Sequence, residues 1–167
     1  MKTLWAPWRI EYIRGEGKTP GCIFCDKPKE TNDRANLILY RGKTCYMMMN
    51  RYPYSNGHIM VLPLRHTKML EDLTSEEKLE LMDQIVLGTE ALKVFSPDGF
   101  NIGMNLGRAA GAGIEDHLHF HVVPRWSGDT NFMPVIGDVR VIPEYLEETY
   151  TRLAGSLESL IKRRGSV

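Results

Sequence analysis

His117-Leu118-His119-Phe120-His121 is the stretch of this sequence that decides its fold and its chemistry. Side chains alternate between the two faces of a β-strand, so the three imidazoles share one face, each about 6.6 Å from the next. Leu118 and Phe120 then point to the other face and can hold the strand on a core. Because the chain has only five histidines, three of them at this spacing indicate a function rather than a chance arrangement.

Two chemistries use such a row of imidazoles. Three histidines can bind a catalytic zinc ion. Alternatively, one neutral imidazole attacks phosphorus while its neighbours bind the phosphoryl oxygens. The glycine-rich segment 105–113 precedes the histidines, and its small residues allow backbone N–H groups to converge on an anion. A glycine-rich segment alone is most often only a turn, but beside three histidines it favours the second chemistry.

The rest of the chain predicts an α+β fold built on an antiparallel sheet. Thr74 and Glu77 have the spacing of a capping box, and apolar residues recur at helical steps from Leu79 to Leu92, which predicts a central helix. Pro143 opens a C-terminal helix with acidic residues early and basic residues late, an order that suits the helix dipole. Short runs bounded by turn residues predict about five strands, at 36–40, 45–49, 58–62, 100–104 and 117–124.

Length and composition predict one ordinary domain over residues 1–167, with residues 1–35 as an irregular N-terminal arm. Of the 167 residues, 43% are hydrophobic, enough for a core without disulfides. The 21 basic and 21 acidic residues balance, which disfavours a nucleic-acid partner. Because we find neither a signal-peptide pattern nor an apolar run of about 18 residues, we expect a cytoplasmic protein without a membrane partner.

Cys22 and Cys25 form a Cys-x-x-Cys pair within this arm. In a reducing compartment the spacing indicates metal binding or redox chemistry rather than a structural disulfide. No strand-then-helix pattern of the thioredoxin type surrounds the pair, and two unremarkable thiols in a loop are a further alternative. As half of a structural zinc site, the pair would need two more ligands, which a separated pair of histidines would supply.

The histidine strand and its flanks resemble the histidine-triad (HIT) family of nucleotidyl hydrolases and transferases. The family motif is His-φ-His-φ-His-φ-φ with φ apolar, and residues 117–123 match it throughout. The resemblance extends upstream to Asn50 and residues 57–63. The downstream residues 124–132, together with residues 4–9, are most similar to the bacterial branch that includes diadenosine tetraphosphate phosphorylases. The resemblance implies the histidine-triad fold and a homodimer or higher homo-oligomer.

It also implies a role for each histidine. His119 would be the nucleophile and would form a nucleotidyl-histidine intermediate at the α-phosphorus. His121 would contact the phosphoryl oxygens, and His58 would orient or polarise the site from the neighbouring strand. Some family members and the related galactose-1-phosphate uridylyltransferases hold a structural zinc ion at positions that match Cys22, Cys25, His66 and His117 of this chain.

The substrate contacts follow from the same resemblance. Asn50 would hydrogen-bond the ribose. Many family members carry Gln or Ser four residues before the triad, where it bonds the phosphates, and this chain has Gly113 there. Backbone N–H groups, Asn105 or Arg108 would then bind the phosphates instead. The full set of expected substrate contacts is Asn50, Asn105, Arg108, Gly111, Gly113 and Trp126.

The sequence therefore predicts an enzyme that transfers or hydrolyses a nucleotidyl group, acting on dinucleoside polyphosphates with phosphate or water as the acceptor. One alternative within this class is a nucleoside phosphoramidate or mononucleotide hydrolase. An alternative from another class is a non-catalytic nucleotide-binding regulatory module. Asp129 and Asp138 could hold a catalytic magnesium ion, but nothing in their spacing demands it.

Overall fold

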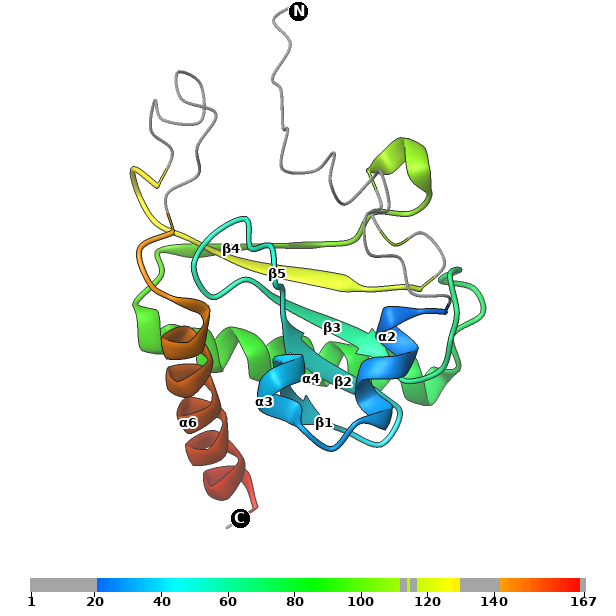
Figure 1. Cartoon of the computed structure of the whole chain (residues 1–167), viewed down its shortest axis with the longest axis horizontal. Helices are drawn as coiled ribbons and strands as arrows, with labels where there is room; N and C mark the ends of the chain where they lie inside the picture. The colour runs from blue at the N-terminus through cyan, green and yellow to red at the C-terminus, as the bar shows by residue number, and fades with distance from the viewer. Residues whose placement is uncertain (1–20, 112–113, 115–116, 130–141, 166–167) are drawn as a thin grey trace, which may run out of the picture.

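The computed structural model describes residues 21–111, 114, 117–129 and 142–165 of the chain (Figure 1). Its five strands form one antiparallel sheet in the order β1-β2-β3-β5-β4, which confirms the predicted fold class. The strands are β1 (Ile38–Arg41), β2 (Cys45–Met49), β3 (Ile59–Pro63), β4 (Gly99–Gly103) and β5 (Phe120–Arg125).

Two long helices, α4 (Ser75–Leu92) and α6 (Leu146–Arg164), complete the fold. α4 begins at the predicted capping box: the Glu77 N–H donates to the Thr74 hydroxyl, and the Thr74 N–H donates to the Glu77 carboxylate. α6 begins later than Pro143, because Tyr145 is its N-cap and has an extended backbone. None of the helices in the described part of the chain is long and apolar enough to cross a membrane.

The arm before β1 is more ordered than the sequence analysis expected. Within its described part it holds α2 (Ile23–Asp26), η1 (Lys27–Lys29) and α3 (Asp33–Asn36). The Asn32 side chain caps α3 by accepting from the Ala35 N–H, a local contact that composition does not reveal. Two further 3-10 turns, η2 (Lys93–Phe95) and η3 (Arg108–Ala110), flank β4.

The histidine strand starts later than predicted. β5 begins at Phe120, whereas residues 117–119 lie outside the ladder. The backbone N–H of Leu118 donates instead to the carbonyl of Thr67, at 2.7 Å. The neighbouring strand β3 ends at Pro63, which has no N–H to continue the pairing.

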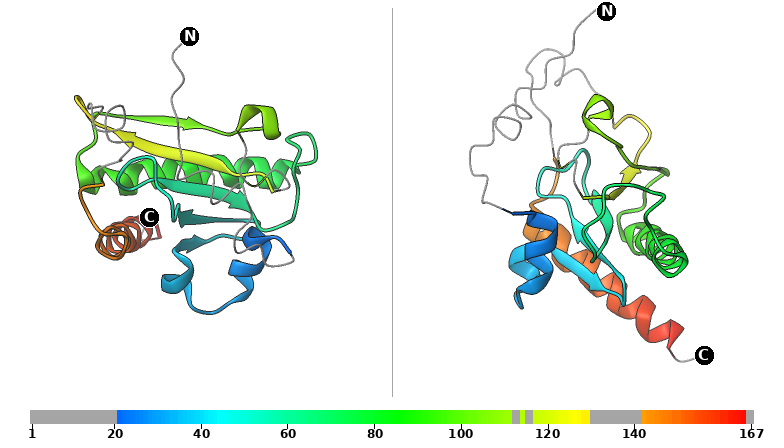
Figure 2. Two further views of the ribbon diagram at one scale, coloured as in Figure 1. Left: turned by 45° about the horizontal axis from the view of Figure 1, so that its top comes forward. Right: turned by 90° about the vertical axis from the view of Figure 1, so that its right-hand side faces the viewer.

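Two apolar cores lie on opposite faces of the sheet, and Figure 2 shows α2 and α4 on these two sides. The larger core contains residues of α4, α6 and the sheet, with Leu118 and Val122 buried in it and Phe120 packed against it. The smaller core contains Phe24 of α2 and alternate residues of β2 and β3. The alternation read from the histidine segment is therefore confirmed for its apolar half.

The face of α4 that packs on this core was not evident from the recurrence of apolar residues. Leu81, Ile85 and Leu92 are buried. Leu79 and Met82, which belong to the same recurrence, are more than half exposed. Two polar side chains, Glu77 and Gln84, occupy buried positions instead, because each bonds a backbone group next to the helix.

Candidate functional site

Three imidazoles line the sheet face opposite α4. His117 and His119 lie in the extended segment before β5, and His121 is the second residue of β5. The rings of His119 and His121 meet edge to face, with their centroids 4.9 Å apart. His121 pairs with Met60 of β3 on one side and with Gly103 of β4 on the other. It therefore lies on an interior strand of the sheet and not on an edge strand.

His119 is held in one tautomer. Its Nδ1 lies 2.8 Å from the carbonyl oxygen of His117, and a carbonyl can only accept, so Nδ1 carries the proton and Nε2 has the lone pair. The side chain is buried, and this burial lowers the pKa of the His119 imidazole. A neutral imidazole with a directed lone pair is the form that attacks an electrophile.

His58 immediately precedes β3 and is fully buried. It contacts the triad from the start of that strand. Its Nε2 lies 2.9 Å from Nδ1 of His121. Asn50 is close by, with its Nδ2 3.4 Å from Nδ1 of His58 and its Oδ1 accepting from the N–H of Tyr52. The structure thus brings His58, His119, His121 and Asn50 together, as expected from the sequence.

Two aromatic residues of the site were missed by the sequence analysis. The Phe24 ring lies 5.2 Å from the His119 ring and 5.7 Å from the His117 ring, measured between centroids. The Tyr54 ring lies 4.7 Å from His58 and 5.6 Å from His121. Their only signal in the sequence is position, since Phe24 lies between the two cysteines and Tyr54 lies four residues before His58.

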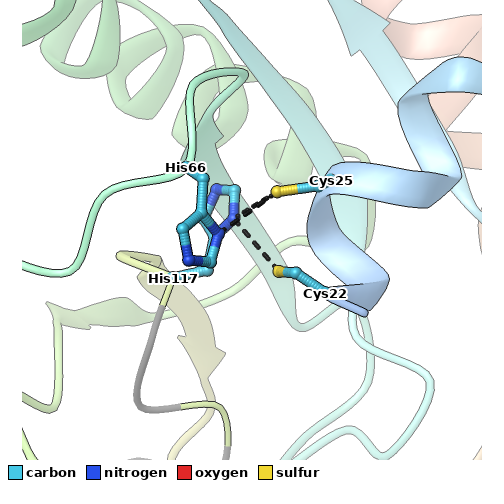
Figure 3. A group of neighbouring side chains, drawn as sticks. All are labelled: Cys22, Cys25, His66 and His117. Atoms are coloured by element: carbon cyan, nitrogen blue, oxygen red, sulfur yellow. Dashed lines mark hydrogen bonds between the residues drawn. The ribbon is translucent and has the colours of Figure 1, made fainter. Parts of the chain in front are cut away.

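The other predicted group is a cluster of two thiols and two imidazoles, in which Cys22 and Cys25 point from the start of α2 toward His66 and His117 (Figure 3). The four ligand atoms all lie within 4.8 Å of one another. The Cys25 sulfur is 3.3 Å from Nδ1 of His66 and 3.4 Å from Nδ1 of His117. The donor set matches a structural zinc site of the Cys₂His₂ type.

His117 is oriented for such a role by its second nitrogen. Its Nε2 lies 2.9 Å from the carbonyl of Pro63, so Nε2 donates and the Nδ1 lone pair faces the sulfurs. His117 therefore turns away from His119 and His121, which disfavours a catalytic zinc shared by all three histidines.

The Cys25 thiol lacks the lowered pKa of a redox-active cysteine. Burial, reinforced by the neighbouring Cys22, raises the pKa of the Cys25 thiol to about 11. Redox-active pairs instead carry a thiol with a lowered pKa. A cation between the sulfurs would favour their thiolate forms, so these residues fit a metal ion better than thiol–disulfide exchange.

The glycine-rich loop leaves the sheet next to the triad, because Gly103 at the end of β4 pairs with His121. Asn105 and Gly111 lie in this loop, and Gly111 has a φ of +85°, a conformation that favours glycine. Arg108 opens the short turn η3. Gly113 falls outside the described residues.

Trp126 lies beyond the opposite end of β5, about 16 Å along the strand from His121. Its indole N–H donates to the backbone carbonyls of Phe95 and Ser96, at 3.2 and 3.1 Å. Within the described residues of one chain, the structure does not bring Trp126 to the triad and gives it a packing role. Asp129 binds Arg125 at this same end, with oxygens 2.6 and 2.7 Å from the guanidinium, and Asp138 falls outside the described residues.

Comparisons with known proteins agree with this geometry. The model of the HIT domain matches residues 31–128. The chain is 41% identical over 163 residues to AP-4-A phosphorylase from Mycobacterium tuberculosis, with 92% of this chain and 83% of the relative covered. It is 34% identical over 93 residues to the asymmetrical bis(5'-nucleosyl)-tetraphosphatase of Schizosaccharomyces pombe, with 55% and 50% covered. A Zn-bound histidine triad family protein from Mycobacterium smegmatis superposes with a TM-score of 0.69 at 27% identity, with 86% and 97% covered.

Proposed function

The chain belongs to the histidine-triad (HIT) family of nucleotidyl transferases and hydrolases, and from this premise we propose that it cleaves dinucleoside polyphosphates through a covalent intermediate on His119. The observation that carries the proposal is the 2.8 Å hydrogen bond from His119 Nδ1 to the His117 carbonyl. It directs the lone pair of Nε2 for attack on phosphorus. Two enzymes similar to this chain, an AP-4-A phosphorylase and a bis(5'-nucleosyl)-tetraphosphatase, support this substrate class.

In the first step, the lone pair of His119 Nε2 forms a bond to the α-phosphorus, and the bond from phosphorus to the bridging oxygen breaks. The electron pair leaves with that oxygen as the anion of a nucleoside polyphosphate. The His119 ring becomes positive, and its Nδ1–H bond to the His117 carbonyl stabilises that charge. His121 donates to the phosphoryl oxygens as they gain charge.

In the second step, water or inorganic phosphate attacks the same phosphorus, and the bond to His119 breaks. The electron pair returns to Nε2, which restores the neutral imidazole, and the proton that an attacking water gives up passes to the solvent.

Asn50 would bind the ribose, and the loop with Asn105, Arg108, Gly111 and Gly113 would bind the remaining phosphates. The start of this loop beside His121 supports that assignment.

We further propose that Cys22, Cys25, His66 and His117 bind one structural zinc ion. When bound, zinc would supply no chemistry to the reaction but would tie α2 to the segment that carries the nucleophile. His117 links the two groups, because its ring faces the sulfurs while its carbonyl accepts from His119. Metal analysis of the purified chain tests this: one zinc lost in Cys22→Ser and retained in the control Cys45→Ala is expected. Zinc retained in Cys22→Ser but lost in a His121 variant would support a catalytic zinc instead.

The nucleophile is tested by substitution. We expect His119→Asn to lower turnover of diadenosine tetraphosphate by at least about 10³-fold, as removal of a covalent nucleophile does. Nucleotide binding, measured by calorimetry with a non-hydrolysable analogue, should survive because the ribose and phosphate contacts remain. A variant with an unchanged rate would exclude the proposed intermediate, and binding without turnover in the unaltered chain would indicate a regulatory module.

The acceptor is tested by running diadenosine tetraphosphate with and without inorganic phosphate. Adenosine diphosphate that appears only with phosphate identifies a phosphorylase. Release of adenosine monophosphate in both reactions identifies a hydrolase.

A further inference from the structure

Among the described residues, two donors point at Nδ1 of His58. The backbone N–H of Tyr54 lies 3.1 Å from Nδ1 of His58. The side-chain amide of Asn50 also directs its nitrogen at this atom, at 3.4 Å, and its orientation follows from Oδ1 accepting the Tyr52 N–H. A backbone N–H can only donate, so Nδ1 of His58 accepts, and the proton of the neutral ring lies on Nε2.

This direction passes on to His121. Nε2 of His58 lies 2.9 Å from Nδ1 of His121. Since His58 donates from Nε2, His121 accepts at Nδ1 and carries its own proton on Nε2. For His121 to gain a second proton at Nδ1, His58 would have to carry its proton on Nδ1, where two donors already point. The chain of bonds therefore keeps His121 neutral, with Nε2 as an N–H donor.

We propose that Tyr54 is the positioning residue that fixes this direction, and that the resulting neutral His121 selects substrates whose leaving group departs as an anion. The inference rests on the proposed function and adds the kind of bond that the enzyme breaks. His121 binds and stabilises the phosphoryl oxygens but does not act as a proton donor to the leaving group.

The selectivity follows from the balance of protons. In a phosphate anhydride, the electron pair of the breaking bond goes to a polyphosphate oxygen, which is stable as an anion at neutral pH. In a phosphoramidate, the pair goes to an amine nitrogen, which has to take up a proton as it leaves. Neutral His121 could supply that proton only by becoming an imidazolate. His58 could return a proton to His121 only if every hydrogen bond from Tyr54 through His58 to His121 changed direction. Anhydrides are therefore cleaved much faster than phosphoramidates.

The Tyr54 side chain reinforces the arrangement. Its ring packs on both imidazoles, with centroids 4.7 Å from His58 and 5.6 Å from His121. His58 is fully buried and His121 is partly buried, so an unmatched donor on His58 is costly. The backbone N–H and the ring of one residue thus act on the same two histidines.

The proton positions can be measured directly on the full chain. Long-range ¹H–¹⁵N correlation spectra of protein labelled at histidine distinguish the two tautomers of each ring. We expect His58 and His121 as neutral Nε2–H forms and His119 as the Nδ1–H form at neutral pH. A proton on Nδ1 of His121, or a charged His121 ring, would overturn the proposal whether or not the protein turns over a dinucleotide.

The selectivity is tested with two substrates that share the adenylyl group, diadenosine tetraphosphate and adenosine 5′-phosphoramidate. We expect kcat/KM for the anhydride to exceed that for the phosphoramidate by at least about 100-fold, the lower end of what a general acid contributes. Comparable values would overturn the proposal. If neither substrate reacted, the proposed function would fail, and the spectra would still decide the direction of the chain.

Variants connect the two measurements. Tyr54→Pro removes the N–H donor, whereas the control Tyr54→Phe keeps both the N–H and the ring. In Tyr54→Pro we expect the Nδ1–H form of His58 and a preference for the anhydride narrowed by at least about 10-fold. Asn50→Asp, which is nearly the same shape, places an acceptor beside His58 Nδ1 but keeps the Tyr54 N–H, and it serves if the proline variant does not fold. In Asn50→Asp we expect the Nε2–H form of His58 and the preference to persist. Unchanged tautomers and preference in Tyr54→Pro, or the Nδ1–H form of His58 in Asn50→Asp, would overturn the role of Tyr54.

Discussion

Glu77 connects the start of α4 to the loop that carries His66, and its replacement by glutamine gives the sharpest stability prediction. Two nitrogens of the Arg65 guanidinium lie 2.9 and 2.8 Å from the two Glu77 oxygens. The same carboxylate accepts from the Thr74 N–H, and Arg65 also donates to the Asp72 carbonyl. The carboxylate thus holds both the helix cap and the backbone next to a candidate zinc ligand.

The magnitude follows from the pKa of this carboxyl. The hydrogen bonds from Arg65, together with those from Thr74, lower the pKa of Glu77 from 4.5 to about 2. A difference of this size corresponds to about 3 kcal/mol at neutral pH. Solvent screens the pair because the Arg65 side chain is 48% exposed, and we therefore expect Glu77→Gln to lower the free energy of unfolding by about 2 kcal/mol.

The pH dependence has a definite sign. Because folding lowers the pKa of Glu77, its contribution is fully present above the unfolded value near 4.5 and is lost as the pH falls toward about 2. Glutamine has no such titration. The gap between the original chain and Glu77→Gln should therefore close as the pH falls through this window.

Urea unfolding followed by circular dichroism at a series of pH values measures this gap. Glu76→Gln is the matched control, since Glu76 lies one residue earlier, is 56% exposed and pairs only with the exposed Lys43 among the described residues. It should change stability by less than about 0.5 kcal/mol. A gap for Glu77→Gln that stayed constant from neutral pH down to about pH 3 would refute the reasoning.

Three further predictions concern packing, a buried hydroxyl and the metal. A methyl group on Gly88 of α4 would lie 2.6 Å from Cδ1 of Ile59, so Gly88→Ala should lower the free energy of unfolding in urea by about 1–3 kcal/mol. The control is Gly155→Ala on α6, where the added methyl group meets no atom within 4 Å. This control should be neutral or stabilising. The buried hydroxyl of Tyr150 donates to the Ile38 carbonyl at 2.8 Å, so Tyr150→Phe should cost about 1–2 kcal/mol in the same assay; no loss would mean that the carbonyl finds another donor. Chelation of zinc should lower the melting temperature of the unaltered chain and leave that of Cys22→Ser unchanged, and an equal shift in both would exclude Cys22 as a ligand.

Local patterns accounted for much of the fold. The capping box at Thr74, the turn residues between the strands and the alternation around His119 all act over a few residues, so they could be recognised directly. The predictions failed where a contact from another element decides the outcome. α3 depends on its Asn32 cap, the histidine strand is shortened because Leu118 bonds Thr67, and Leu79 is exposed because the sheet covers a different face of α4.

For the candidate site, the sequence by itself determined which chemistry is available. Alternation along an extended segment predicts three imidazoles on one face, and the Cys22–Cys25 spacing predicts half of a metal site. The family resemblance implied a different role for each histidine, and the tertiary structure supplies the contacts that distinguish them. Pro63 and the thiols turn His117 away, the His117 carbonyl directs His119, and the Tyr54 N–H directs His121 through His58. The physical reason is that the local backbone alone sets the face to which a side chain points. Which ring nitrogen carries the proton depends instead on hydrogen-bond partners, and only the packing of β3, β5 and the surrounding loops brings those partners close enough.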